Sequence, residues 1–253
     1  MNKSKIIVER HEGVTTIIIN RPEVRNALDR EATAALGAAL REFEADERAL
    51  VAVLHGTGGA FCAGADLKEL ASGSKYEAWA GDDGPLSRPL SKPVIAAVAG
   101  HACAGGLGLA LWCDLRVVEQ SASFAVLSRR WGVPMSDGTT VRLPRLIGTS
   151  HALDMLLTAR IVPADEALAM GLANRVVPDG TSREAAEQLA WTMAKFPQIA
   201  MRSDRQSVLA QEGLTETAAL SVEAHLAQEA KDLEAQAGAA RFASGIGRHG
   251  ALA

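Results

Sequence analysis

Apolar residues in the first half of the chain form short unbroken runs, and these runs alternate with segments of helical periodicity. Residues 6–8 and 14–19 are β-branched runs separated by Glu12-Gly13, which predicts a hairpin. Residues 50–54 and 94–99 are apolar runs of strand length, as expected for strands buried on both faces. Asp29 is placed to cap a helix that continues to about residue 45. This alternation indicates an α/β architecture.

The pattern changes to helices after Gly138. Helical periodicity is found in residues 138–147, 150–159, 163–170, 182–195, 198–211 and 215–240. Phe196-Pro197 interrupts this series, because a helix usually ends before a proline. We therefore predict a core of residues 1–196 and a C-terminal helical subdomain of residues 197–253.

Composition and charge narrow the class of protein. The chain has 253 residues, of which 48% are hydrophobic and 22% charged, as is typical of a soluble globular protein. A net charge of −4 and an aromatic content of 4% argue against a nucleic-acid partner. No apolar run is long enough to span a bilayer, and residues 1–13 have too few consecutive apolar residues for a signal peptide, so no membrane partner is expected. The cysteines Cys62, Cys103 and Cys113 form no CxxC pair, which favours a cytoplasmic location.

Several common chemistries lack their motifs. The chain has no GxxxxGK[ST] phosphate loop, and residues 100–108, which loosely resemble a nucleotide loop, carry no GxGxxG dinucleotide fingerprint. Its six histidines never fall at the spacing of metal ligands, so no metal site is expected. Gly148-Thr149-Ser150-His151-Ala152 resembles a nucleophile elbow but lacks the final glycine, and an N-cap serine is the simpler interpretation.

Two turns rich in small residues remain as candidates for chemistry. They are residues 61–66 and 101–106, and each comes after a buried strand. Glycine and alanine let a ligand approach the backbone closely, and N–H groups at a helix start carry partial positive charge. Two such turns side by side could hold an oxyanion. Alternatively, the glycines only allow strands and helices to pack closely.

Taken in order, these segments resemble the crotonase (enoyl-CoA hydratase/isomerase) superfamily over nearly the whole chain. The matching stretches are residues 20–28 (NRPEVRNAL), 61–69 (FCAGADLKE), 92–98 (KPVIAAV), 104–106 (AGG), 113–116 (CDLR), 142–148 (RLPRLIG) and 171–177 (GLANRVV). The resemblance implies a crotonase-type spiral of ββα turns with a C-terminal helical subdomain. It also implies a homotrimer or a hexamer built as a dimer of trimers.

The same resemblance implies an acyl-CoA thioester as substrate, with no cofactor beyond the coenzyme A that it carries. The two oxyanion donors of the family correspond to the backbone N–H groups of Ala65 and Gly105, and one such donor is worth roughly 3 kcal/mol. Further substrate contacts correspond to Arg25, Ala63, Asp66, Leu67 and Lys68, and, in the tail, to Phe242 and Arg248. Arg25 and Lys68 could equally be solvated surface cations.

The chain departs from the family pattern at the hydratase glutamates. Gly108 and Ser128 occupy the two positions at which typical hydratases carry glutamate, and general acid–base groups contribute about 10²- to 10⁴-fold each. A carboxylate remains nearby at Asp137, within one alignment position of the aspartate used by dienoyl-CoA isomerases. Asp137 could act as a base with a raised pKa, or cap the helix that begins near Gly138. Ser128 and Trp131 are expected to line the same region.

The leading hypothesis is therefore an enzyme that stabilises a thioester enolate and moves a proton through Asp137. Such an enzyme would isomerise its substrate rather than hydrate it, although hydration by other groups stays open. Decarboxylation or thioester hydrolysis on the same scaffold is a second hypothesis for an enzyme. Both reactions need the oxyanion site but fewer carboxylates than hydration does. A protein that binds acyl-CoA without chemistry is the alternative from a different class.

Overall fold

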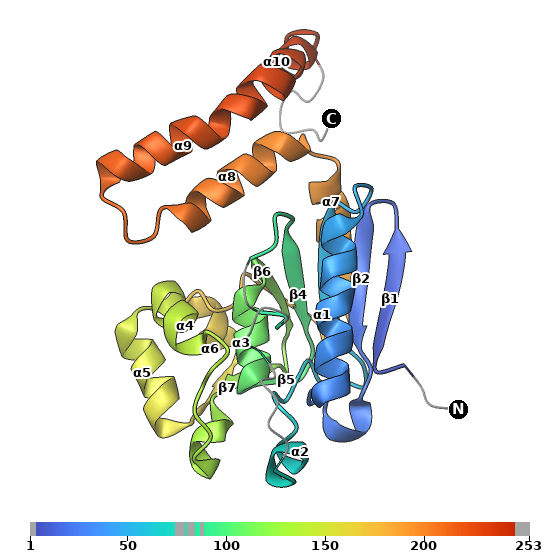
Figure 1. The fold of residues 1–253 in the computed structure, drawn as a ribbon, viewed down its shortest axis with the longest axis vertical. Helices are drawn as coiled ribbons and strands as arrows, with labels where there is room; N and C mark the ends of the chain where they lie inside the picture. The colour runs from blue at the N-terminus through green and yellow to red at the C-terminus, as the bar shows by residue number, and fades with distance from the viewer. Residues whose placement is uncertain (1–3, 74–78, 80–83, 87–88, 246–253) are drawn as a thin grey trace. The chain divides into compact units, whose positions relative to one another are not determined.

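The computed structural model describes residues 4–73, 79, 84–86 and 89–245 (Figure 1). The chain divides into two compact units, Met1–Ala194 and Lys195–Ala253. The sequence places the corresponding boundary after residue 196, at Phe196-Pro197.

The N-terminal unit is built around a six-stranded sheet. Its strands are β1 (Ile6–His11), β2 (Val14–Ile19), β3 (Val51–Gly56), β4 (Val94–Val98), β6 (Leu115–Glu119) and β9 (Arg175–Val177). Their order across the sheet is β1-β2-β3-β4-β6-β9. The predicted hairpin pairs β1 with β2 in antiparallel fashion, and every later pair is parallel.

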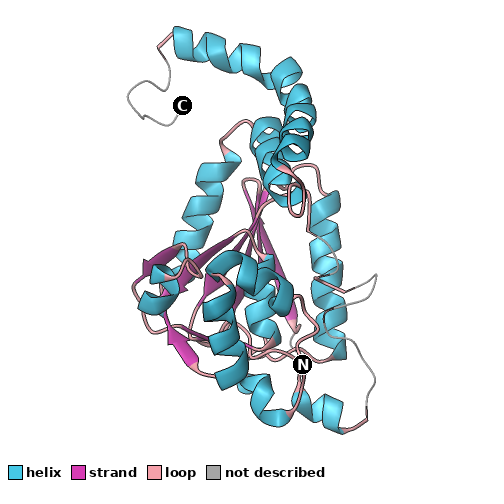
Figure 2. Cartoon of the chain, turned by 90° about the vertical axis from the view of Figure 1, so that its left-hand side faces the viewer, coloured by secondary structure: helices cyan, strands magenta, loops and turns pink. Residues whose placement is uncertain are grey.

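Both faces of this sheet are buried at β2, β3 and β4, which explains the unbroken apolar runs. Alternate side chains of one strand enter different clusters: Leu54 of β3 packs with α1 (Arg30–Ala45), whereas Val53 packs with α7 (Ser182–Ala194). Figure 2 shows helices on either side of the strands. The Asp29 side chain accepts from the N–H of Ala32, as predicted for a helix cap.

A second sheet of three short strands supports the two candidate turns. It contains β5 (His101–Cys103), β7 (Ser123–Ala125) and β8 (Ile161–Pro163) in the order β5-β7-β8. Isolated bridges join Leu28 to Ala65 and Cys62 to Ala102. Residues 61–66 are therefore tied to the start of α1 on one side and to β5 on the other. The remaining elements of this unit are η1 (Pro22–Val24), α2 (Leu67–Ala71), α3 (Gly105–Trp112), η2 (Leu127–Trp131), α4 (Thr139–Ile147), α5 (Thr149–Thr158) and α6 (Ala164–Ala169).

The C-terminal unit is helical. It contains α8 (Gln198–Ala210), α9 (Glu216–Ala230), a π-helical segment η3 (Lys231–Ala235) and α10 (Gln236–Ala243). The sequence predicts one helix over 215–240, and η3 divides that stretch. Glu234 of η3 accepts from the N–H groups of Ile199 and Ala200 at 3.1 and 2.8 Å, which caps the start of α8. Among the helices in the described ranges, none is both long and apolar enough to cross a bilayer.

Candidate active site

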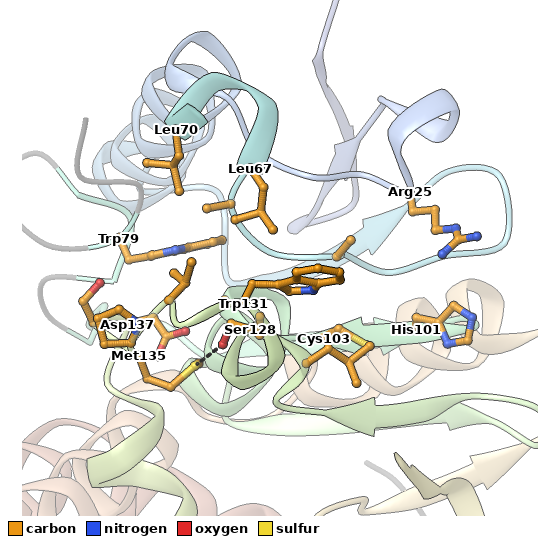
Figure 3. Close-up of a pocket in the computed structure, with 18 of the residues that line it drawn as sticks. Arg25, Leu67, Leu70, Trp79, His101, Cys103, Ser128, Trp131, Met135 and Asp137 are labelled. Carbon is orange, nitrogen blue, oxygen red and sulfur yellow. Dashed lines mark hydrogen bonds between the residues drawn. The ribbon is translucent and has the colours of Figure 1, made fainter. Parts of the chain in front are cut away.

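A cavity of about 700 Å³ opens in the N-terminal unit beside the two candidate turns. Figure 3 shows Arg25 and His101 at one end, and Trp79, Met135 and Asp137 at the other. The predicted site residues that line this cavity are Arg25, Ala63, Ala65, Leu67, Gly105, Ser128, Trp131 and Asp137. The fold thus brings together residues that are more than a hundred positions apart in the chain.

The first turn is held by the stretch that the sequence reads as NRPEVRNAL. Asn26 is fully buried, and its amide donates to the carbonyl oxygens of Thr57 and Ala60 at 2.8 and 2.6 Å. Arg21 contacts the carboxylates of Asp29 and Asp66 at 2.9 and 3.2 Å. These buried contacts fix the loop through residues 57–66 against the start of α1.

Arg25 is positioned through its backbone rather than its side chain. Its φ is 53°, in the left-handed region, and its carbonyl oxygen accepts from the N–H of Ala63 at 3.0 Å. Arg25 is exposed, and it lines the cavity at the end away from Asp137, where an anionic group of a ligand could reach its guanidinium.

The second turn places the start of α3 on the cavity. Gly105 is the first residue of α3, so its N–H has no acceptor within the helix. Within the described ranges, the N–H groups of Ala65 and Gly105 donate no hydrogen bond to another protein group. Both residues line the cavity. The two donors are therefore available to a ligand oxygen.

The two turns approach each other closely at Gly64. A methyl group added to Gly64 would lie 2.9 Å from the Gly105 nitrogen and 3.1 Å from the Cys103 carbonyl oxygen. The φ of Gly64 is 101°, which side chains rarely adopt. Glycine is therefore required here both for the backbone conformation and for the contact that sets the two N–H groups side by side.

The backbone of Ala104, next to the Gly105 donor, has a strained conformation. Its φ of 49° and ψ of −122° belong to a region that glycine favours. Such a conformation costs about 1–3 kcal/mol in a residue with a Cβ, and such strain is concentrated at functional sites.

Replacing Ala104 with glycine is expected to raise the free energy of unfolding by about 1 kcal/mol, because the relieved strain exceeds the added entropy of the unfolded chain. Urea denaturation measures the change. Ala159→Gly is the matched control: Ala159 has φ 53° and ψ 31°, an ordinary left-handed conformation, so its gain should be smaller. A loss of stability in Ala104→Gly would show that the methyl group is held by packing rather than tolerated under strain.

Asp137 uses its two carboxylate oxygens differently. Oδ1 accepts from the N–H of Thr139 at 2.9 Å, and the Arg142 guanidinium donates to the Asp137 carbonyl oxygen at 2.9 Å. Oδ2 lies against Gly108 of α3. The side chain therefore binds the first turn of α4 and faces the cavity at the same time. A role of Asp137 as a helix cap is thus compatible with a role as a base.

The absence of a side chain at Gly108 leaves space for the carboxyl group of Asp137. A methyl group added to Gly108 would lie 2.5 Å from Cγ and 2.6 Å from Oδ2 of Asp137, so the Asp137 side chain would have to move. The carboxyl group of Asp137 thus fills the space into which a side chain at position 108 would project.

Burial raises the pKa of Asp137 above its ordinary value, against the opposing effects of the Thr139 N–H and of Arg142. The side chain is 4% exposed. A carboxylate with a raised pKa is a stronger base than one in water. By contrast, burial raises the pKa of the Cys103 thiol, which also lines the cavity, to about 11, so this thiol is protonated at neutral pH.

Ser128 is buried and points toward Met135 at the same end of the cavity. Its hydroxyl donates to the Met135 sulfur at 3.3 Å (Figure 3). Trp131, from the same η2 segment, is 72% exposed. Neither residue presents an ionisable group to Asp137. Within the described ranges, no group of three His, Cys, Asp or Glu side chains is placed to hold a metal ion.

Some residues that were predicted to contact the substrate are not among the described residues that line the cavity. The Asp66 side chain caps α2 by accepting from the N–H of Lys68 at 3.1 Å, and neither residue lines the cavity. Phe242 is an exposed residue of α10 in the C-terminal unit. Arg248 lies outside the described residues. A contact of Phe242 or Arg248 with substrate stays a prediction.

The cavity also contains residues that the sequence did not single out. Trp79, Leu70 and Met135 form an apolar lining near Asp137, and His101 accompanies Arg25 at the other end. A ring nitrogen of His101, Nδ1, lies 2.8 Å from the Ser123 hydroxyl oxygen. Trp79 is one of two aromatic residues, with Tyr76, in the polar, glycine-bearing segment of residues 72–88, and that contrast is the signal that could have marked it.

The profile of the enoyl-CoA hydratase/isomerase family matches residues 9–245 of this chain. The chain belongs to the enoyl-CoA hydratase/isomerase family. It is 34% identical to enoyl-CoA hydratase EchA19 of Mycobacterium tuberculosis over 228 residues, which cover 87% of this chain and 86% of that protein. It is 32% identical to a short-chain-enoyl-CoA hydratase of Clostridium acetobutylicum, with 82% of each chain covered.

The fold agrees with this membership. The crystal structure of enoyl-CoA hydratase EchA1 from Mycobacterium marinum matches with a TM-score of 0.91 and 30% identity, over 96% of both chains. The predicted crotonase-type α/β fold with helices at the C-terminus is thereby confirmed. Membership of this enzyme family is compatible with more than one reaction, so the reaction has to be argued from the cavity.

Proposed function

We propose that this chain isomerises an enoyl thioester of coenzyme A, with Asp137 as the group that moves the proton. The observation that carries the proposal is the position of the Asp137 carboxyl, which lies on the cavity in the space next to Gly108. The relatives' names, as enoyl-CoA hydratases, support an enoyl thioester as the class of substrate.

The Ala65 and Gly105 N–H groups would bind the thioester oxygen and stabilise its negative charge in the enolate. Donors that are fixed in place before the reaction cost no reorganisation, and each is worth roughly 3 kcal/mol. No cofactor is required for this step beyond the coenzyme A of the substrate. Arg25, at the far end of the cavity, would face the anionic part of that group.

A single carboxylate suffices for isomerisation. The Asp137 carboxylate takes a proton from the carbon next to the thioester, which leaves a dienolate and a protonated Asp137. The same proton is then returned to the far carbon of the dienolate, and the double bond has moved without gain or loss of atoms. Hydration also has to activate a water molecule, and the family resemblance puts Gly108 and Ser128 where hydratases carry the two glutamates for that task. Among the described residues that line the cavity, Asp137 is the one carboxylate.

The test is a comparison of two reactions on matched thioesters. With a 3-enoyl thioester we expect conversion to the conjugated 2-enoyl thioester, followed by its ultraviolet absorbance. With the 2-enoyl thioester in isotope-labelled water we expect little label in a 3-hydroxyacyl product, with hydration at least ~10²-fold slower than isomerisation, since a general acid–base group is missing. Comparable rates for the two reactions would overturn the proposal in favour of hydration.

Assays with further thioesters test the other hypotheses for the function of this cavity. Release of carbon dioxide from a malonyl-type thioester, or of free coenzyme A, would indicate a decarboxylase or a thioesterase. Binding of acyl-CoA by calorimetry without turnover of any thioester would indicate a non-catalytic binding protein. A trimeric or hexameric assembly and a cytoplasmic location remain predictions from the sequence.

A further inference from the structure

Trp79 is buried at the end of the cavity that contains Asp137, although the segment around it is polar. Its side chain is 5% exposed and joins the main apolar core, while it also lines the cavity. A methyl group added to Gly105 would lie 2.2 Å from Cζ2 and 2.3 Å from Cε2 of the indole. The indole therefore packs directly on the helix position that supplies one of the two oxyanion donors.

Trp79 and Asp137 occupy adjacent places on one face of α3. Gly105 and Gly108 are three residues apart, so their side-chain positions lie about 5–6 Å apart on the same face of the helix. The indole contacts the first position and the Asp137 carboxyl contacts the second. Figure 3 shows both side chains at the same end of the cavity. Neither could pack in this way if α3 carried a side chain at Gly105 or Gly108.

We propose that Trp79 is a positioning residue, which together with the glycine face of α3 shields the Asp137 carboxyl from water and holds it toward the bound acyl group. The indole has the area and rigidity that this task needs, because a large aromatic ring excludes water at little cost in conformational entropy.

Shielding of this kind changes the basicity of the carboxyl. Desolvation disfavours the charged form of an acid, and it is the largest cause of the raised pKa of Asp137. The charged side chain that acts on this carboxyl is Arg142 of α4, which favours ionisation. The other side chains at this end of the cavity, Ser128, Met135 and Trp79, carry no charge. Loss of the indole should therefore lower the pKa of Asp137.

The experiment measures that pKa directly in Trp79→Ala and Trp79→Phe. Carbon NMR of protein labelled at the aspartate carboxyl carbon follows the titration, and the Asp137 signal is assigned by its absence in Asp137→Asn. We expect the pKa to fall by about one unit in Trp79→Ala and by less in Trp79→Phe, because a phenyl ring restores part of the shielding. Trp191→Phe removes a tryptophan of α7 that contacts His11, away from the cavity, and should leave the pKa unchanged.

The kinetic readout rests on the proposed function, whereas the NMR readout does not. In Trp79→Ala the rise of kcat with pH should move to lower pH and its plateau should fall, since a weaker base removes the proton more slowly. A merely structural role would lower the melting temperature and leave the pKa in place. An unchanged pKa in a folded variant overturns the inference, and Trp79→Phe decides the matter should Trp79→Ala not fold. Absence of turnover in the wild type, with the pKa shift present, contradicts the proposed function alone.

Discussion

Replacing Asp137 with asparagine is expected to lower kcat for isomerisation by about 10²- to 10⁴-fold, with a much smaller change in KM. Asparagine keeps an oxygen that can accept from the Thr139 N–H, so the start of α4 should retain its geometry. It cannot take up a proton, so the step that forms the dienolate loses its base. Steady-state kinetics on a 3-enoyl thioester measures the effect.

The same substitution should make the protein more stable at neutral pH. Because burial raises the pKa of Asp137, the unfolded chain ionises this group more readily than the folded chain does. This difference in pKa lowers the free energy of unfolding at pH values above the ordinary pKa of 3.8. The loss grows as the pH rises toward the pKa of the folded state, and it vanishes below pH 3.8. Thermal melts should therefore show Asp137→Asn above the wild type at neutral pH, and equal to it in strong acid.

Asp179→Asn is the matched control for these measurements. Asp179 also accepts from a backbone N–H, that of Ser121 at 2.9 Å, but it is exposed and does not line the cavity. Its replacement should leave kcat unchanged. If Asp137→Asn kept full activity, the carboxyl would be only a helix cap, and the proton would have to move through another group.

Strands β2, β3 and β4 of the main sheet could be predicted from the sequence because they are buried on both faces. A strand such as β3 then consists of apolar residues without interruption, and this pattern is visible without knowing its neighbours. The exposed edge strand β9 and the strands of the second sheet were not predicted. β5 and β7 have three residues each, and His101 and Ser123 carry no strand signal, because the pairing between them is set by segments distant in sequence.

The candidate site was predictable where the backbone itself supplies the chemistry. The turns at Ala65 and Gly105 need small residues, and small residues after a buried strand are visible in the sequence. The places of Trp79 and Asp137 were not visible, since each is defined by contact with one face of α3 across the fold. The resemblance pointed to Asp137, but only the structure places its carboxyl beside Gly108 and beneath the same helix face as the indole.

Gly64→Ala is expected to have the second large effect, a loss of about 10²-fold or more in kcat/KM. The added methyl group would lie 2.9 Å from the Gly105 nitrogen and 3.1 Å from the Cys103 carbonyl oxygen. Both are backbone atoms of the second turn, so the two turns must separate and the N–H groups of Ala65 and Gly105 can no longer bind one oxygen. Loss of one such donor costs about 3 kcal/mol in the transition state.

Gly59→Ala separates this effect from backbone strain. Gly59 also has a positive φ, 76°, but a methyl group there would have no atom within 4 Å. Both substitutions should lower the melting temperature, because an alanine is strained at a positive φ. Only Gly64→Ala should lower kcat/KM in the folded protein, measured with the 3-enoyl thioester at a temperature well below either melt. Equal losses in the two variants would mean that strain alone explains the defect, and that the close approach of the two turns does not create the oxyanion site.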